Sequence, residues 1–140
     1  MKDKHEIILY LRIMEFDCDP DEITSALGVM PSKVWRKGEL MNDYSPRIYK
    51  RNGWRIDSGV DRYRDFNDHL QALFDIIEPN VEAFKAVCSQ YYTDLSCAVY
   101  MYHSEEESSI PWIHFDKRAT RILGMIGAEI DFDMYTLPGD

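Results

Sequence analysis

Apolar and polar residues alternate in two long segments of the chain, and this pattern predicts two β-strands. In Ile7–Glu15 every second residue is a large aliphatic one, while the positions between them include Tyr10 and Arg12. Asp94–His103 repeats the pattern, with Leu, Cys, Val and Met on one face. A period of two residues is that of a strand with one buried face. We therefore expect both segments to be strands whose aliphatic faces lie in the core.

Shorter stretches of alternation predict four further strands. These are expected at Lys33–Leu40, Arg47–Ser58, Ile110–Phe115 and Ala128–Tyr135. Pro111 lacks a backbone N–H, which favours an edge position for the third of them, after a turn at 105–109. In the last one, acidic residues occupy the positions between the apolar ones, so that strand is expected to have an acidic outer face.

Apolar residues at three- and four-residue steps from Phe66 to Tyr91 predict the longest helix of the chain. Pro79 lies inside it and is expected to kink or split it near Glu78. A shorter helix is expected to begin after Asp116 and to end at Gly124.

The acidic run from Asp17 to Glu22 predicts the start of another short helix. Asp19 is a favourable N-cap, Pro20 suits the first helical position, and Glu22 completes a capping box. Gly28 is a favourable helix end. The alternating acids also resemble a calcium loop, but Glu22 and Gly28 stand where that loop requires Gly and Glu. Helix capping is therefore the favoured interpretation.

The order of these elements predicts the fold. The segments Thr24–Gly28 and Thr120–Gly124 share three of five residues, and each belongs to a short helix beside a strand. We expect a single α+β domain over residues 1–140, pseudo-duplicated, with a largely antiparallel sheet and its helices on one face. The residues expected to be buried are Ile7, Leu9, Leu11, Leu95, Cys97, Val99, Ile130 and Phe132.

Charge is distributed unevenly along the chain, whose net charge is −9. Residues 33–64 hold nine of the 16 Lys and Arg but only four of the 25 Asp and Glu. The overall acidity argues against nucleic-acid and membrane partners, and no apolar run is long enough to span a bilayer. Three cysteines without a CxxC pair predict reduced thiols in a cytoplasmic protein.

The basic segment is the candidate binding site. Its candidate residues are Trp35, Arg36, Lys37, Arg51, Trp54 and Arg55. Guanidinium groups beside indole rings can bind a phosphate or a carboxylate. In the alternative interpretation, which we favour, the bases neutralise acids of the same domain, with Glu129, Asp131 and Asp133 as the expected partners.

The sequence favours a non-enzymatic protein. Cys97 is expected to pack in the core, and no nucleophile, phosphate-loop or zinc-protease motif is present. His103 and His114 are expected to lie too far apart to share a metal ion. We therefore predict no catalytic residue, no metal site and no cofactor.

Several short motifs together resemble a known family. They are Asp19–Thr24, Leu27-Gly28, Pro31-Ser32, Trp35–Glu39, Gly53-Trp54, Ser58 and Leu95–Cys97, followed by the final acidic strand. This set is similar to the bacterial family called domain of unknown function 4279, over roughly Ile7 to Tyr135. The resemblance implies a small stand-alone bacterial domain and supplies no catalytic or ligand residues.

Two hypotheses of function follow. The first is a binding protein that docks another protein, such as an immunity protein or inhibitor of a basic toxin, because the domain is small and acidic. The second is a module that binds a small anion, such as a nucleotide, at the basic segment between the two Trp residues.

Overall fold

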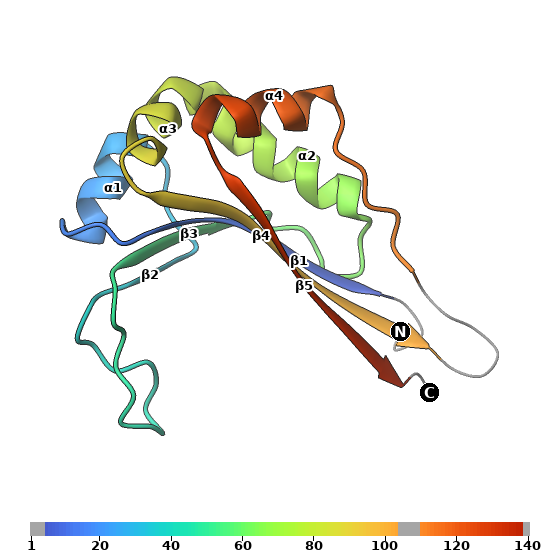
Figure 1. Ribbon diagram of the computed structural model, residues 1–140, viewed down its shortest axis with the longest axis horizontal. Helices are drawn as coiled ribbons and strands as arrows, with labels where there is room; N and C mark the ends of the chain where they lie inside the picture. Colours follow the sequence, from blue (N-terminus) through green and yellow to red (C-terminus); the bar gives the residue numbers. More distant parts are fainter. Residues whose placement is uncertain (1–4, 104–109, 139–140) are drawn as a thin grey trace.

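A single β-sheet carries a layer of helices on one of its faces in the computed structural model, which describes residues 5–103 and 110–138 (Figure 1). The described strands are β1 (Glu6–Met14), β2 (Lys33–Trp35), β3 (Gly53–Asp57), β4 (Tyr92–His103) and β5 (Glu129–Pro138). Their order across the sheet is β2-β3-β1-β4-β5, and adjacent strands are antiparallel except β4 and β5. The predicted α+β class with a mostly antiparallel sheet is confirmed.

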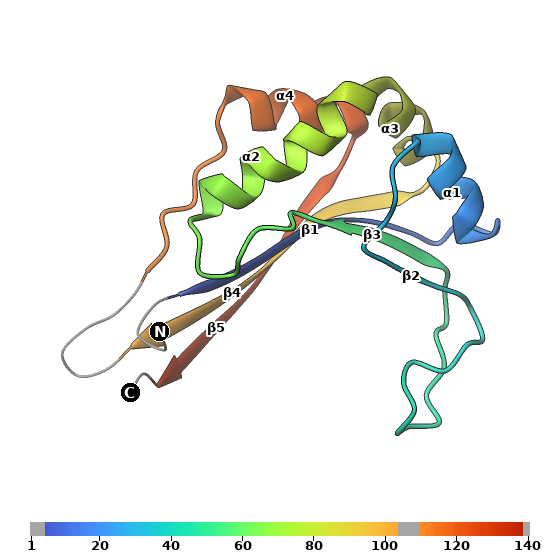
Figure 2. The same ribbon diagram turned by 180° about the vertical axis from the view of Figure 1, so that it is seen from behind.

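The helices all lie on the same side of the sheet in both views (Figures 1 and 2). They are α1 (Pro20–Leu27), α2 (Phe66–Ile77), the 3-10 turn η1 (Glu78–Asn80), α3 (Val81–Cys88) and α4 (Lys117–Ile126). The predicted break at Pro79 is confirmed, because η1 separates α2 from α3 at that residue. None of the helices in the described ranges is long and apolar enough to cross a membrane.

Capping fixes where the short helices begin. The Asp19 carboxylate accepts a hydrogen bond from the Asp21 N–H at 2.9 Å, and Glu22 accepts one from the Asp19 N–H at 3.1 Å, as the predicted capping box requires. Asp116 caps α4 through the Ala119 N–H at 2.8 Å.

The predicted end of α4 at Gly124 is wrong. The helix continues to Ile126, whose side chain is buried, and ends at Gly127, which has a φ of 72°.

The core lies between the helices and the sheet. The predicted core residues of β1 and β4 are all buried, namely Ile7, Leu9, Leu11, Leu95, Cys97 and Val99. The same prediction is wrong for β5, where Ile130 is 48% exposed and Phe132 is only partly buried. The reason is position, since β5 ends the sheet and has a neighbouring strand on one side only.

The second half of the chain has one strand fewer than predicted. Residues 110–115 form no strand, and the turn predicted at 105–109 lies outside the described residues. Instead α4 carries the chain back to the start of β4, so that β5 runs beside β4 in parallel from Asp94↔Glu129 onwards. A strand–helix–strand crossover of this kind occupies the place that a hairpin partner of β4 would need.

The sheet face opposite the helices is polar at its centre. Asp94 on β4 is fully buried there, and it accepts hydrogen bonds from Arg12 at 2.7 and 3.2 Å. The hydroxyls of Tyr92 and Ser96 each donate to the same carboxylate at 2.9 Å. The Asp94 hydrogen bond raises the pKa of Tyr92 to about 12. A buried charge that is paired and fully hydrogen-bonded in this way tolerates the low dielectric of the sheet.

Candidate functional site

The basic segment leaves the sheet after a short pairing. β2 and β3 pair only from Lys33↔Arg55 to Trp35↔Gly53, so the two long strands predicted there are wrong in length. Residues 36–52, here called the arm, project away from the sheet as a hairpin (Figures 1 and 2). The arm is held by its own backbone, with N–H groups of Gly38 and Met41 donating across it at 2.9 Å. Beyond Trp35 the pairing within the arm is reduced to an isolated bridge between Leu40 and Ile48.

The arm exposes both apolar and basic side chains. Its exposed large apolar residues are Leu40, Met41, Tyr44 and Ile48, with Leu40 60% and Tyr44 97% exposed. The arm holds five basic residues against two acidic ones. Exposed apolar side chains gathered on one projecting element are typical of a surface that contacts another molecule.

Arg36 lies at the root of the arm and binds the start of α1. Its guanidinium donates to both oxygens of Asp19, at 3.0 and 3.1 Å, and lies 3.4 Å from Asp21. The hydrogen bond from Arg36, followed by that from the Asp21 N–H, lowers the pKa of Asp19. The carboxylate that caps α1 therefore also fixes the direction in which the arm leaves the body.

Two other arginines of the segment are also bound within the chain. Arg51 forms an ion pair with Glu15, a residue in the left-handed region at a φ of 68°. Arg55 donates to both oxygens of Asp57, at 2.5 and 3.2 Å, and its guanidinium lies 3.8 Å from the centre of the Tyr10 ring. These contacts engage most of the Arg55 guanidinium, whereas the Arg51 side chain remains 61% exposed.

The two tryptophans of the candidate set lie on opposite faces of the sheet. Trp54 is fully buried in the core and donates its Nε1–H to the Thr24 hydroxyl at 3.0 Å, so it does not line a binding surface. Trp35 packs directly over Gly53, where an added Cβ would lie 1.9 Å from the indole ring. Its ring centre is 6.0 Å from that of Tyr49 in the arm.

The prediction that Glu129, Asp131 and Asp133 neutralise the bases is wrong. Glu129, Asp131 and Asp133 are on β5, at the opposite edge of the sheet from β2. The carboxylates that bind the arginines instead come from the end of β1, the start of α1 and β3 itself. The arginines of the basic segment are therefore neutralised within the domain, but by carboxylates that lie close to the arm.

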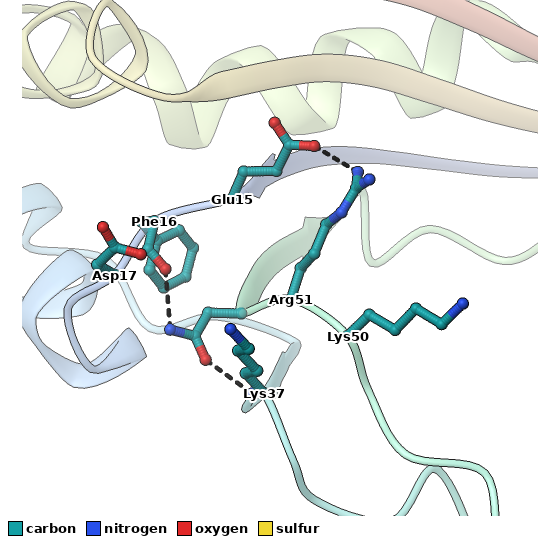
Figure 3. A pocket seen from close by; sticks show the side chains of 7 residues that line it. Glu15, Phe16, Asp17, Lys37, Lys50 and Arg51 are labelled. Atoms are coloured by element: carbon teal, nitrogen blue, oxygen red, sulfur yellow. Dashed lines mark hydrogen bonds and ion pairs between the residues drawn. The ribbon is translucent and has the colours of Figure 1, made fainter.

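An open cavity of about 480 Å³ lies between the arm root and the end of β1 (Figure 3). It is lined by Glu15, Phe16, Asp17, Lys37, Lys50, Arg51 and Asn52. In Figure 3 Arg51 reaches Glu15, whereas no bond leads from the ammonium group of Lys37 or Lys50. Within the described ranges neither lysine forms an ion pair, so these two cations are the ones available to an anionic group.

Sequence reasoning missed Lys50 and Asn52 in this cavity. The Asn52 amide donates to the Phe16 carbonyl at 2.8 Å and accepts from the Lys37 N–H at 2.8 Å, which joins the arm root to the end of β1. By local sequence, Asn52 followed by Gly53 indicates a turn, and it does not indicate a bridge to a segment more than 30 residues away.

A buried Ser–His pair also escaped the sequence analysis. Ser58 Oγ lies 2.6 Å from His69 Nδ1, and both residues are buried between the end of β3 and α2. Desolvation is the main cause that lowers the pKa of His69, and its Nε2 has no hydrogen-bond partner in the described part of the chain. The pair therefore joins the segment that follows β3 to α2.

Two other reactive side chains, Cys97 and His114, lie apart from each other in the described chain. Burial raises the pKa of Cys97 to about 12, so the thiol stays protonated and unreactive. The His114 ring stacks on Trp112 at 4.9 Å. Among residues 5–103 and 110–138 no group of three or more His, Cys, Asp or Glu side chains is placed to hold a metal ion.

These features define a small α+β protein with one helix-covered sheet face, one open face and a projecting basic arm. The chain belongs to the family described as Domain of unknown function (DUF4279), which it matches over residues 5–137. No curated protein and no solved structure matches the chain.

Proposed function

We propose that this protein is a non-enzymatic binding protein that docks another protein through its arm. The observation that carries the proposal is the exposure of Leu40, Met41, Tyr44 and Ile48 on the arm. The arm's contacts with the body are made at its root, by residues such as Arg36, Arg51 and Asn52. Isolated exposed apolar residues are ordinary on protein surfaces, but a cluster rimmed by charges marks an interaction site. A large aromatic residue at the tip is also the type that most often anchors an interface.

The charge of the arm indicates what kind of protein surface it contacts. Arg36 and Arg51 are bound to carboxylates of the body, which leaves Lys37, Arg47 and Lys50 facing solvent. A partner surface with acidic residues around an apolar patch complements this arrangement. Inhibition of a basic partner, which the overall acidity favours, would use a different surface of the domain.

Affinity capture from the native cell lysate, identified by mass spectrometry, tests the proposal. The arm variant combines Leu40→Ser, Tyr44→Ala and Ile48→Ser, and the matched control is Met30→Ser, an exposed apolar residue outside the arm. We expect the arm variant to lose the proteins that the wild type and the control retain. Its urea midpoint should remain unchanged, because these side chains do not contribute to the core. Retention of every captured protein by a folded arm variant would contradict the proposal.

A second candidate function, binding of a small anion such as a nucleotide, is favoured by the cavity at the arm root. Lys37 and Lys50 line it and form no ion pair with any residue that the structure describes, and Asn52 holds its wall in place. Titration calorimetry with inorganic phosphate and with a nucleoside triphosphate tests this function. Binding should weaken with salt, and it should disappear in Lys37→Ala with Lys50→Ala but not in Lys33→Ala. Heat signals that are equal in all three proteins would exclude the cavity as the site.

A further inference from the structure

β5 is a long strand at one end of the sheet, and its outer edge is unpaired within the described part of the chain. It pairs with β4 over ten residue positions, from Asp94↔Glu129 to His103↔Pro138. On its other side no strand of the described chain lies next to it. The opposite end of the sheet is β2, which has only three residues. Long exposed edges are sites where another chain can add a strand, and proteins usually shorten or cover them.

The two faces of this edge have different chemistry. The face away from the helices carries Glu129, Asp131 and Asp133, and the ion pairs of the described chain all involve other carboxylates. The face toward the helices carries Ile130 and Met134, which are 48% and 53% exposed. On one side the edge therefore presents carboxylates that form no ion pair within the described ranges. On the other side Ile130 and Met134 are exposed, while Phe132 between them packs against Phe66 and Phe115.

An apolar groove lies beside the same edge. It has a volume of about 590 Å³ between α4 and β5, and it is lined by Phe115, Thr120, Leu123, Gly124, Gly127, Ala128 and Ile130. Gly124 lies inside α4, where glycine is unfavourable, and a Cβ added there would meet no atom within 4 Å. Packing within the chain therefore does not require a glycine at this position. Its small size keeps the groove open next to β5.

We propose that β5 accepts an extended strand of a partner protein in which apolar and basic residues alternate. Successive side chains of an added strand point to opposite faces of the sheet. One set would continue the row of Ile130 and Met134 into the groove, and the other would lie opposite Glu129, Asp131 and Asp133. A second copy of β5 does not suit this edge, because antiparallel self-pairing sets acids against acids. This surface is separate from the arm and does not depend on the arm's function.

Fluorescence anisotropy with a labelled ten-residue peptide of alternating lysine and valine tests the inference. Two peptides serve as controls, one with glutamate in place of lysine and one with the same composition in a lysine block and a valine block. We expect the alternating lysine peptide to bind at least tenfold more tightly than either control. Equal binding of the block peptide would show charge attraction without strand addition and would overturn the proposal.

Variants of the protein locate the binding. Asp131→Lys with Asp133→Lys should weaken binding at least tenfold, while Asp43→Lys with Glu82→Lys, an equal change of net charge elsewhere, should have a much smaller effect. Gly124→Leu should fill the groove and weaken binding without lowering the melting temperature, since leucine favours the helix. Wild-type affinity in both the Asp131/Asp133 variant and the Gly124 variant would overturn the assignment.

The free protein provides the remaining test. Analytical sedimentation of the free protein should show a monomer. If the protein instead self-associates, and if Asp131→Lys with Asp133→Lys abolishes the association, then the basic arm of another copy occupies the edge. That result would overturn the assignment to a foreign strand. The variant that removes the apolar residues of the arm should bind the alternating peptide as the wild type does, so the two surfaces are tested separately.

Discussion

The two edges of the sheet differ in whether their charge is already used within the fold. At the β2 edge the sequence is rich in bases, but Arg36, Arg51 and Arg55 are bound to carboxylates of the same chain. At the β5 edge Glu129 and its acidic neighbours have no cation partner in the described ranges. A local excess of charge in a sequence therefore does not identify the charge that a partner meets, because ion pairs between distant segments remove part of it.

The two tryptophans of the basic edge also differ, since Trp54 is buried in the core and Trp35 lies on the open face. Their replacement predicts the largest loss of stability. Trp54→Ala should lower the free energy of unfolding by about 3–5 kcal/mol, because it empties the core and leaves the Thr24 hydroxyl without its donor. Trp35→Ala should cost clearly less, since that ring lies on the open face. Urea denaturation measures both values. A larger loss for Trp35 than for Trp54 would reverse the assignment of the two rings.

The close contact between Gly53 and the Trp35 ring predicts the next largest loss of stability. A methyl group at Gly53 would lie 1.9 Å from the Trp35 ring, so Gly53→Ala should displace the indole and cost about 1–3 kcal/mol. The matched control is Gly124→Ala at the β5 edge, where the added Cβ meets nothing and the helix gains stability. The two variants should therefore shift the urea midpoint in opposite directions.

Most of the fold could be predicted because it depends on local patterns. β1, β4, the capping box at Asp19 and the break at Pro79 each follow from residue spacing within one segment. The strands predicted at 33–40 and 47–58 were too long, and the strand predicted at 110–115 was wrong, because alternation shows only that a segment can pair. Whether a neighbouring strand is available depends on the path of the whole chain, here on α4 returning β5 to the side of β4.

The candidate site was predicted less well, for a related physical reason. The basic character of the segment was evident, and neutralisation within the domain was the favoured interpretation. Two partners were misplaced because Asp19 and Glu15 reach Arg36 and Arg51 only once β1, α1 and the arm are assembled. Asp57 is different, since it lies two residues from Arg55 on the same strand and on the same face. The cavity that Lys50 and Asn52 line also forms only on assembly, since its far wall comes from the end of β1.

The pair of Asp19 and Arg36 predicts a small effect that depends on pH. The pKa of Asp19 is lowered in the folded protein from its usual 3.8, so the charged carboxylate stabilises the fold above that pH. This contribution is lost as the pH falls through the lowered pKa. Asp19→Asn keeps an N-cap but removes the charge. Its melting temperature should lie below that of the wild type at neutral pH, and the gap should close in acid.

A control variant shows whether the pH dependence of the melting temperature is specific to Asp19. Asp43→Asn, at the exposed tip of the arm, should follow the wild type at every pH. A gap between Asp19→Asn and the wild type that persists unchanged below the lowered pKa would mean that the loss arises from the cap and not from the ion pair.

Comparison of two double variants by urea denaturation tests most directly whether the bases of the arm root divide into bound and free ones. Arg36→Ala with Arg55→Ala removes two guanidinium groups that bind carboxylates of the body. Lys37→Ala with Lys50→Ala removes two cations that form no ion pair within the described ranges. The arginine variant should unfold at a lower urea concentration than the wild type, and the lysine variant should unfold at the wild-type concentration. Equal losses in both variants, or a loss only in the lysine variant, would contradict the account.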